Sequence, residues 1–280
     1  DCMEGWISLT ALLHETSRLR GGVLVSGMVY RHPGVLANMA STLDITSGGR
    51  LELGIGAGWN EEECDAFGIE LGSMRERFDR FEEGLEVLDS LLTNERTTFR
   101  GNYYALTDAM NNPKPVQRPL PICIGGRGRQ RTLPLAARYA SHWNFSGQDM
   151  VEFAKCRAVL HERCADIGRD PAEITCSTLA RYTGNDAELR SDVAAMEAVG
   201  VDLVIVSLPK SESPTVIERV AGAIDDPAEQ GIAHADLRNR VVWNHPRIRH
   251  DAGHGAGRHQ EQAVAGEADH FGQHRRLSVA

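Results

Sequence analysis

The chain has 280 residues, of which 41% are hydrophobic and 25% are charged, and its formal net charge at neutral pH is −9. This composition is typical of a globular protein, and the length suffices for one large domain or two small ones. The negative charge argues against nucleic acid and anionic membrane as partners, because both would repel an acidic surface.

Six cysteines are spread along the chain without a Cys-x-x-Cys pair, so neither a zinc site nor a dense disulfide framework is indicated. No apolar run approaches the roughly 20 residues that span a bilayer, and the first residues lack a basic segment followed by an apolar one. We therefore expect a cytoplasmic protein without a membrane segment.

In chain order, strands and helices alternate from the first residues onward. A helix over residues 6–17 leads into a buried strand at 23–27, and a second helix begins near Pro33 and ends at 47–49. A strand at 51–56 then runs into a glycine-rich segment. A long amphipathic helix follows over residues 74–92, and residues 99–106 are predicted to form a small strand or hairpin outside the repeat.

The alternation continues to about residue 208. Four more strands are predicted at residues 121–125, 142–145, 174–180 and 202–208, with helices over 132–139, 150–167 and 186–199. Such alternation is typical of a parallel sheet with helical crossovers, either an open doubly wound sheet or a closed barrel. We count six strands, whereas a closed (β/α)8 barrel has eight. Because the chain opens inside a helix that feeds a strand, the first two strands are those we expect to be missing.

The composition changes at about residue 225. Residues 225–280 hold seven of the eleven histidines, among many Arg, Gly and Ala and with little apolar periodicity. Such a segment cannot bury enough surface to offset its chain entropy, and the irregular spacing argues against a metal site. We predict a barrel domain over residues 1–224 with an insertion around 95–119, followed by a low-order tail at 225–280 of the kind that a frame shift produces.

Glycine-rich segments follow three of the predicted strands, at the end where ligands bind in parallel α/β folds. In the first, Gly54, Gly56 and Gly58 precede Trp59 and Asn60. Residues without a Cβ allow a flat ring or a phosphate to approach the backbone. The spacing is not the dinucleotide fingerprint, and a plain tight turn explains it equally well.

The second segment, at residues 124–132, places three glycines and three arginines between a strand and a helix. Backbone N–H groups at a helix start, together with guanidinium groups, make an anion site, for which a phosphate is the obvious occupant. The alternative is a solvated basic face. The third segment, Ser26 and Gly27, should open onto the same side, or it is only a turn.

The sequence gives little support for other kinds of active site. His14, His32 and His142 stand alone in the sequence and are interpreted as structural imidazoles. The chain has no Gly-x-Ser-x-Gly elbow, no His-Glu-x-x-His and no Walker lysine. Nucleophilic, zinc-peptidase and nucleotide-triphosphatase functions are disfavoured accordingly, and we predict no metal.

Taken in order, these segments resemble the luciferase-like monooxygenase superfamily, and most closely its coenzyme F-420-dependent branch. The matching stretches are residues 4–20, 30–37, 42–60, 77–80, 113–119 and 124–126, with further support from 136–140 and from Trp143 and Asn144. Six ordered motifs are far more specific than any one of them, and they cover roughly residues 1–220.

The resemblance implies a (β/α)8 barrel of the bacterial luciferase type, apparently lacking its first two strands. An extra segment near the middle strands of that fold would account for the insertion. The cofactor ring is expected at the carboxyl face of the barrel, against a bulge at Ser26 and Gly27 that is often a cis peptide in this family. The other expected cofactor contacts are Gly56, Ala57, Gly58, Trp59 and Asn60 with the ring or ribityl chain, and Gly125, Gly126, Arg127 and Gly128 with the phosphate.

The implied activity is hydride transfer or monooxygenation of a small organic substrate with coenzyme F-420, or alternatively reduced FMN. In such enzymes the cofactor carries the demanding chemistry. Ala57 stands where several deazaflavin-dependent relatives have a proton-donating carboxylate, so no catalytic acid or base is predicted. We expect no partner beyond the small-molecule substrate and, at most, a second copy of the chain.

Two alternatives stay open. One is a catalytically degenerate flavin-binding barrel, or a non-functional barrel fragment. The other, a sugar-phosphate isomerase or lyase barrel, would need a lysine or a carboxylate pair at neighbouring strand ends, and no such pair is found in order.

Overall fold

The computed structural model describes residues 3–208 and 215–225, so the predicted tail from residue 226 onward lies outside the described residues. Its helices are α1 (Gly5–Glu15), α2 (Pro33–Thr46), α3 (Glu61–Phe67), α4 (Met74–Thr93), α5 (Thr132–Tyr139), α6 (Met150–Asp166), α7 (Asp186–Ala198) and α8 (Thr215–Asp225). Its strands are β1 (Ser26–Gly27), β2 (Leu53–Gly56), β3 (Thr97–Arg100), β4 (Ala105–Ala109), β5 (Ile122–Gly125), β6 (His142–Phe145), β7 (Thr175–Arg181) and β8 (Leu203–Ser207).

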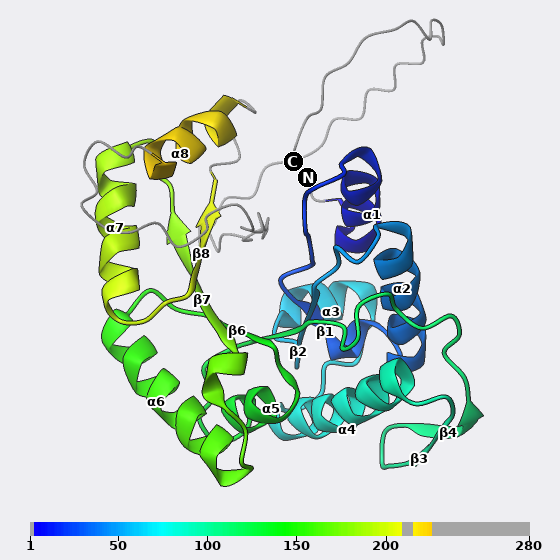
Figure 1. Cartoon of the computed structure of the whole chain (residues 1–280). Helices are drawn as coiled ribbons and strands as arrows, with labels where there is room; N and C mark the ends of the chain where they lie inside the picture. The colour runs from blue at the N-terminus through cyan, green and yellow to red at the C-terminus, as the bar shows by residue number, and fades with distance from the viewer. Residues whose placement is uncertain (1–2, 209–214, 226–280) are drawn as a thin grey trace, which may run out of the picture.

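Six strands form one parallel sheet in the order β1-β2-β5-β6-β7-β8, which confirms the predicted number of strands, although the first of them is much shorter than predicted. The helices between them run along the outer side of this curved sheet (Figure 1). The remaining pair, β3 and β4, forms a separate antiparallel hairpin, one of the two forms expected within the insertion. Because all six strands are parallel, their carboxyl ends lie at the same edge of the sheet.

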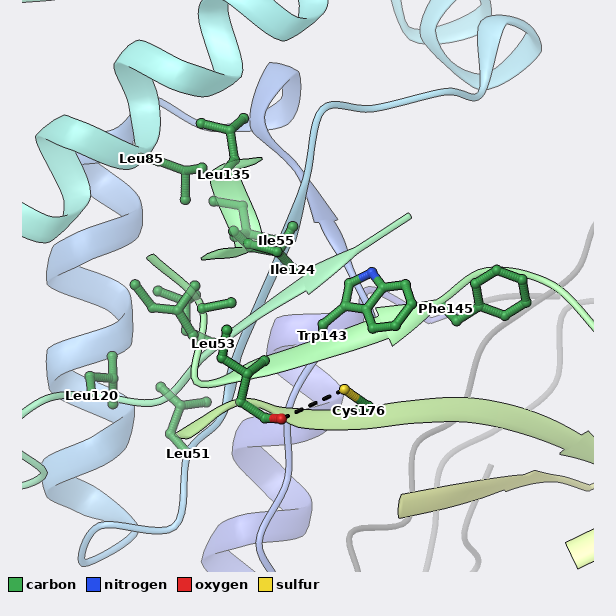
Figure 2. Packing of buried hydrophobic residues seen from close by; sticks show 14 of the residues in the cluster. Leu51, Leu53, Ile55, Leu85, Leu120, Ile124, Leu135, Trp143, Phe145 and Cys176 are labelled. Atoms are coloured by element: carbon green, nitrogen blue, oxygen red, sulfur yellow. Dashed lines mark hydrogen bonds between the residues drawn. The ribbon is translucent and has the colours of Figure 1, made fainter. Parts of the chain in front are cut away.

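The two faces of the sheet bury different clusters. The outer face carries the large apolar core under the helices, including Ile124, Trp143 and Phe145 (Figure 2). The inner face holds a smaller cluster in which Leu24 next to β1 and Ile205 of β8 take part. Since β1 and β8 are the opposite edges of the sheet, a shared cluster means that the sheet curls towards a barrel.

Local sequence signals explain the longest helix. Ser73 and Glu76 form a capping box at the start of α4, which satisfies two backbone N–H groups that the first turn leaves unpaired. The predicted apolar stripe is largely buried against the outer face, with Phe81, Leu85 and Leu88 nearly inaccessible. The helix predicted over residues 74–92 is thus confirmed.

The strand predicted at 23–27 is mostly not a strand. Only Ser26 and Gly27 pair with β2, and Gly21 makes an isolated bridge to Leu51. Between them the chain crosses the inner side of β2, and the peptide bond between Leu24 and Val25 is cis. The buried, apolar character that suggested a strand is real, but it belongs to an irregular segment.

The described residues contain no disulfide bond, no candidate metal site and no candidate membrane span. The five described cysteines are free and buried. Within residues 3–208 and 215–225 there is no cluster of three or more His, Cys, Asp or Glu side chains that could hold a metal. None of the described helices is long and apolar enough to cross a bilayer.

Candidate functional site

The three glycine segments meet on one rim. Gly27 pairs with Gly56, and Ile55 pairs with Ile124, so β1, β2 and β5 end side by side. A Cβ on Gly27 would lie 3.3 Å from the Gly58 Cα, which shows how closely the first two segments approach. We call residues 25–27, 56–60 and 125–128 the glycine rim; their juxtaposition is the one that the sequence predicted.

Val25 fills a cradle of glycines on the inner side of this rim. A Cβ on Gly56 would lie 3.0 Å from the Val25 side chain, and one on Gly125 would lie 3.3 Å from it. A Cβ on Gly54 would lie only 2.0 Å from the Val23 carbonyl oxygen. The glycines therefore allow the segment around the cis peptide to cross β2, and the partly exposed Val25 forms an apolar floor.

The expected bulge is displaced by two residues. The cis peptide bond joins Leu24 and Val25, not Ser26 and Gly27, which corrects that detail of the resemblance. The Ser26 side chain is buried and its hydroxyl accepts a hydrogen bond from the Trp6 indole at 2.7 Å. Ser26 thus ties α1 to the rim, while Val25, which the sequence did not single out, presents its side chain there.

The segment 125–128 leads into α5, which begins without a side-chain cap. The three arginines of the predicted segment 124–132 differ in environment: Arg129 pairs with Glu152 at 2.6 Å, and Arg131 pairs with Asp79 at 2.7 Å. Within residues 3–208 and 215–225, nothing pairs with the exposed Arg127 guanidinium. Of the predicted basic face, Arg127 is the side chain that a phosphate could engage without breaking an ion pair.

In the loop between β2 and α3, the polar side chain of Asn60 is hydrogen-bonded within the protein. The Asn60 side chain accepts a hydrogen bond from the Glu63 backbone N–H and so caps α3. Trp59 is 63% exposed, whereas Ala57 packs partly against the core. The Asn60 side chain therefore serves as a helix cap, and its expected contact with the cofactor stays a prediction.

A titratable pair stands behind the rim where the sequence predicted none. The Tyr30 ring would touch a Cβ on Gly27 at 2.9 Å, and its hydroxyl donates to Glu63 at 2.6 Å. Burial and this hydrogen bond raise the pKa of Tyr30, so the phenol stays protonated at neutral pH. The helix α3 that carries Glu63 was not predicted, which is why the pair was missed.

A chain of polar side chains crosses the inside of the sheet below the rim. Arg20 donates to Glu52 at 3.2 Å, and Glu52 lies 3.4 Å from the Nδ1 atom of His142. The His142 Nε2 atom is 2.6 Å from the Ser177 hydroxyl, which also accepts a hydrogen bond from Asn144 at 2.8 Å. His142 is structural, as expected, but it belongs to a network that reaches the rim at Asn144.

The charge of His142 is set by this network. Burial lowers the pKa of the imidazole, but the neighbouring Cys123 sulfur and the Glu52 carboxylate raise it more, to about 10. Burial raises the pKa of Glu52, yet its contacts with His142 and Arg20 lower it on balance. Both groups are therefore charged at neutral pH, as a buried ion pair.

Stability should depend on pH through this pair. The pKa of His142 in the folded protein lies above its ordinary value of 6.5. The protonated imidazole therefore contributes fully to the free energy of unfolding below pH 6.5, and this contribution is lost as the pH rises towards 10. We expect the free energy of unfolding to fall across that range by at most about 1.4 kcal/mol per pH unit. The contribution of Glu52 is lost at the acid end instead, as the pH falls below 4.5.

Urea unfolding at several pH values measures this dependence. His142→Gln should flatten the alkaline slope, whereas His14→Gln, at an exposed position, should leave it unchanged. An alkaline slope that persists in His142→Gln would show that another group is responsible.

Comparison with known proteins agrees with this geometry. A model of the luciferase-like monooxygenase family matches residues 2–271, a span that runs past residue 220, where the motifs end. The F-420-dependent hydroxymycolic acid dehydrogenase of Mycobacterium tuberculosis is 30% identical over 236 residues, which are 83% of this chain and 62% of that protein. The FMNH2-dependent dimethylsulfone monooxygenase of Pseudomonas putida is 31% identical over 125 residues, 45% of this chain and 34% of that one.

Among solved structures, an F-420-dependent secondary alcohol dehydrogenase in complex with an F-420–acetone adduct superposes with a TM-score of 0.72. It is 17% identical, and the alignment covers 81% of this chain and 86% of that one. The described sheet and helices are thus those of the luciferase-type (β/α) barrel. That two strands are missing from it stays a prediction.

Proposed function

Because the chain belongs to the luciferase-like monooxygenase family, we propose that it transfers a hydride between coenzyme F-420 and a small organic substrate, with the deazaflavin ring on the glycine rim. Its class is that of flavin- or deazaflavin-dependent oxidoreductases, to which the named relatives belong. F-420 is favoured over FMN because the named relative that aligns with 83% of this chain and the superposed structure are both F-420-dependent, whereas the named FMNH2-dependent relative aligns with 45% of it.

The observation that carries the proposal is the meeting of the three glycine segments at one strand edge. Gly56 and Gly125 leave room for the Val25 side chain, which is partly exposed and offers an apolar floor for a flat ring. The uncapped start of α5 and the unpaired guanidinium of Arg127 fit the phosphate that F-420 and FMN share. The residues present therefore fit such a cofactor.

The cofactor, when bound, supplies the site that accepts or donates the hydride. The protein would bind and orient this cofactor: the glycine rim would hold the ring, and the segment 125–128 would hold the phosphate. Val25 and the exposed Trp59 offer apolar surface to exclude water from the reacting face. Tyr30, held by Glu63, lies against Gly27 of the rim and keeps its proton. Its hydroxyl is committed to Glu63, so we assign it no part in the reaction.

Arg127→Ala tests the phosphate end of the proposal. Loss of a charge-assisted hydrogen bond should raise the Kd for FMN about 10-fold, while the Kd for riboflavin, which lacks the phosphate, should not change. Flavin fluorescence measures both. Arg129→Ala is the matched control, because its guanidinium is already paired with Glu152. Equal losses for FMN and riboflavin would place the phosphate elsewhere.

A further inference from the structure

The floor of the glycine rim has a polar half beside its apolar half. Val25 lies against Gly56 and Gly125, and Asn144 is paired in register with Gly125 on the next strand. Trp143 and Phe145, its neighbours in β6, belong to the outer core (Figure 2). Because side chains alternate along a strand, the Asn144 amide lies on the inner face, at the level of Val25.

The orientation of this amide is fixed by its partners. Asn144 Nδ2 donates to Ser177 at 2.8 Å, and Ser177 is also held by His142 at 2.6 Å. His142 is held in turn by Glu52. Among the residues that the structure describes, none donates to Asn144 Oδ1. The buried amide therefore presents an oriented, unused acceptor at the rim.

We propose that Asn144 recognises the pyrimidine edge of the cofactor ring, its Oδ1 accepting a hydrogen bond from the ring N3–H. Ser177 and His142 are positioning residues that hold the amide in this orientation. The inference rests on the proposed function. Its chemical basis is that a flavin or deazaflavin ring has an apolar benzenoid edge and a polar pyrimidine edge, which match the two halves of the floor.

The assignment carries a consequence for specificity. The N3–H group is common to flavins and deazaflavins, which differ at the central ring. Asn144 therefore contributes to the affinity for both rings by the same factor, and it does not choose between F-420 and FMN.

The test is a comparison of FMN with FMN methylated at N3, titrated into the full chain by flavin fluorescence. Wild type should bind FMN about 10-fold more tightly than the methylated ring, the worth of one hydrogen bond. Asn144→Ala should bind FMN about 10-fold more weakly than wild type and should no longer distinguish the two rings. Asn102→Ala, at an exposed loop position, is the control and should behave as wild type. If wild type binds F-420 and not FMN, F-420 and its N3-methyl derivative replace them.

The positioning role has its own pair of variants. His142→Gln keeps an N–H donor for Ser177 and should keep the preference for unmethylated FMN, whereas His142→Leu should lose most of it. An Asn144→Ala protein that discriminates the two rings as strongly as wild type would overturn the inference and leave the proposed function standing. Wild-type protein that binds FMN and N3-methyl FMN with equal affinity would likewise overturn the inference and leave the proposed function standing. Wild type that binds neither FMN nor F-420 would overturn both.

Discussion

Gly54→Ala is expected to destabilise the protein more than the same change at any glycine of the glycine rim. The new Cβ would lie 2.0 Å from the Val23 carbonyl oxygen and 3.1 Å from its carbon. Both are backbone atoms, so no rotamer change can relieve the clash, and the segment that carries Val25 must leave β2. We expect the free energy of unfolding in urea to fall by about 3 kcal/mol or more.

The matched control is Gly222→Ala in α8. A Cβ there meets nothing within 4 Å, and alanine favours a helix over glycine by about 1 kcal/mol. This variant should be as stable as wild type or slightly more so. If Gly54→Ala unfolds at the same urea concentration as Gly222→Ala, the crossing of β2 described above is wrong.

Trp143→Ala is the second large effect, because Trp143 joins the core to the phosphate end of the site. Its buried ring stacks on Phe153 with centroids 5.6 Å apart, and its indole donates to the Gly126 carbonyl at 2.8 Å. Removing the ring should cost about 3–5 kcal/mol of unfolding free energy, since the cavity cannot be refilled by its aromatic neighbours. Thermal or urea unfolding measures the loss.

Trp143→Phe separates packing from the hydrogen bond. It keeps an aromatic ring but frees the Gly126 carbonyl, so we expect about 1 kcal/mol of destabilisation together with weaker binding of FMN. Phe153→Leu, which perturbs the same cluster without touching Gly126, should lower stability and leave the affinity for FMN nearly unchanged. Equal affinities in Trp143→Phe and wild type would show that this bond does not order the segment 125–128.

Much of the fold could be predicted because its signals are local. The capping box at Ser73 and the stripe through Phe81 and Leu88 define α4, and buried apolar runs define the strands of the sheet. By contrast, α3 has seven residues and buries only Cys64, so it offers no apolar stripe to detect. Its one usable signal was the pair of caps, Asn60 at the start and the left-handed Gly68 at the end.

The candidate site likewise has one part that could be predicted from the sequence and one part that could not. Glycines after successive parallel strands predict a shared rim, and the structure places them there. The contact of Val25 with Gly125 could not be predicted, because these residues lie about a hundred positions apart and meet only where the irregular segment 22–25 crosses β2. The network runs from Glu52, just before β2, through His142 of β6 to Ser177 of β7 and back to Asn144 of β6, so residues far apart in the sequence form it and no local spacing reveals it.

The most direct test of the account is a structure of the protein with F-420 bound, and one with FMN. The account predicts that the ring lies on the Val25 side of the glycine rim, with its phosphate against residues 125–128. A ring bound at any other surface, or a phosphate that points away from α5, would contradict it. A protein that takes up neither cofactor at saturating concentration would favour the degenerate barrel instead.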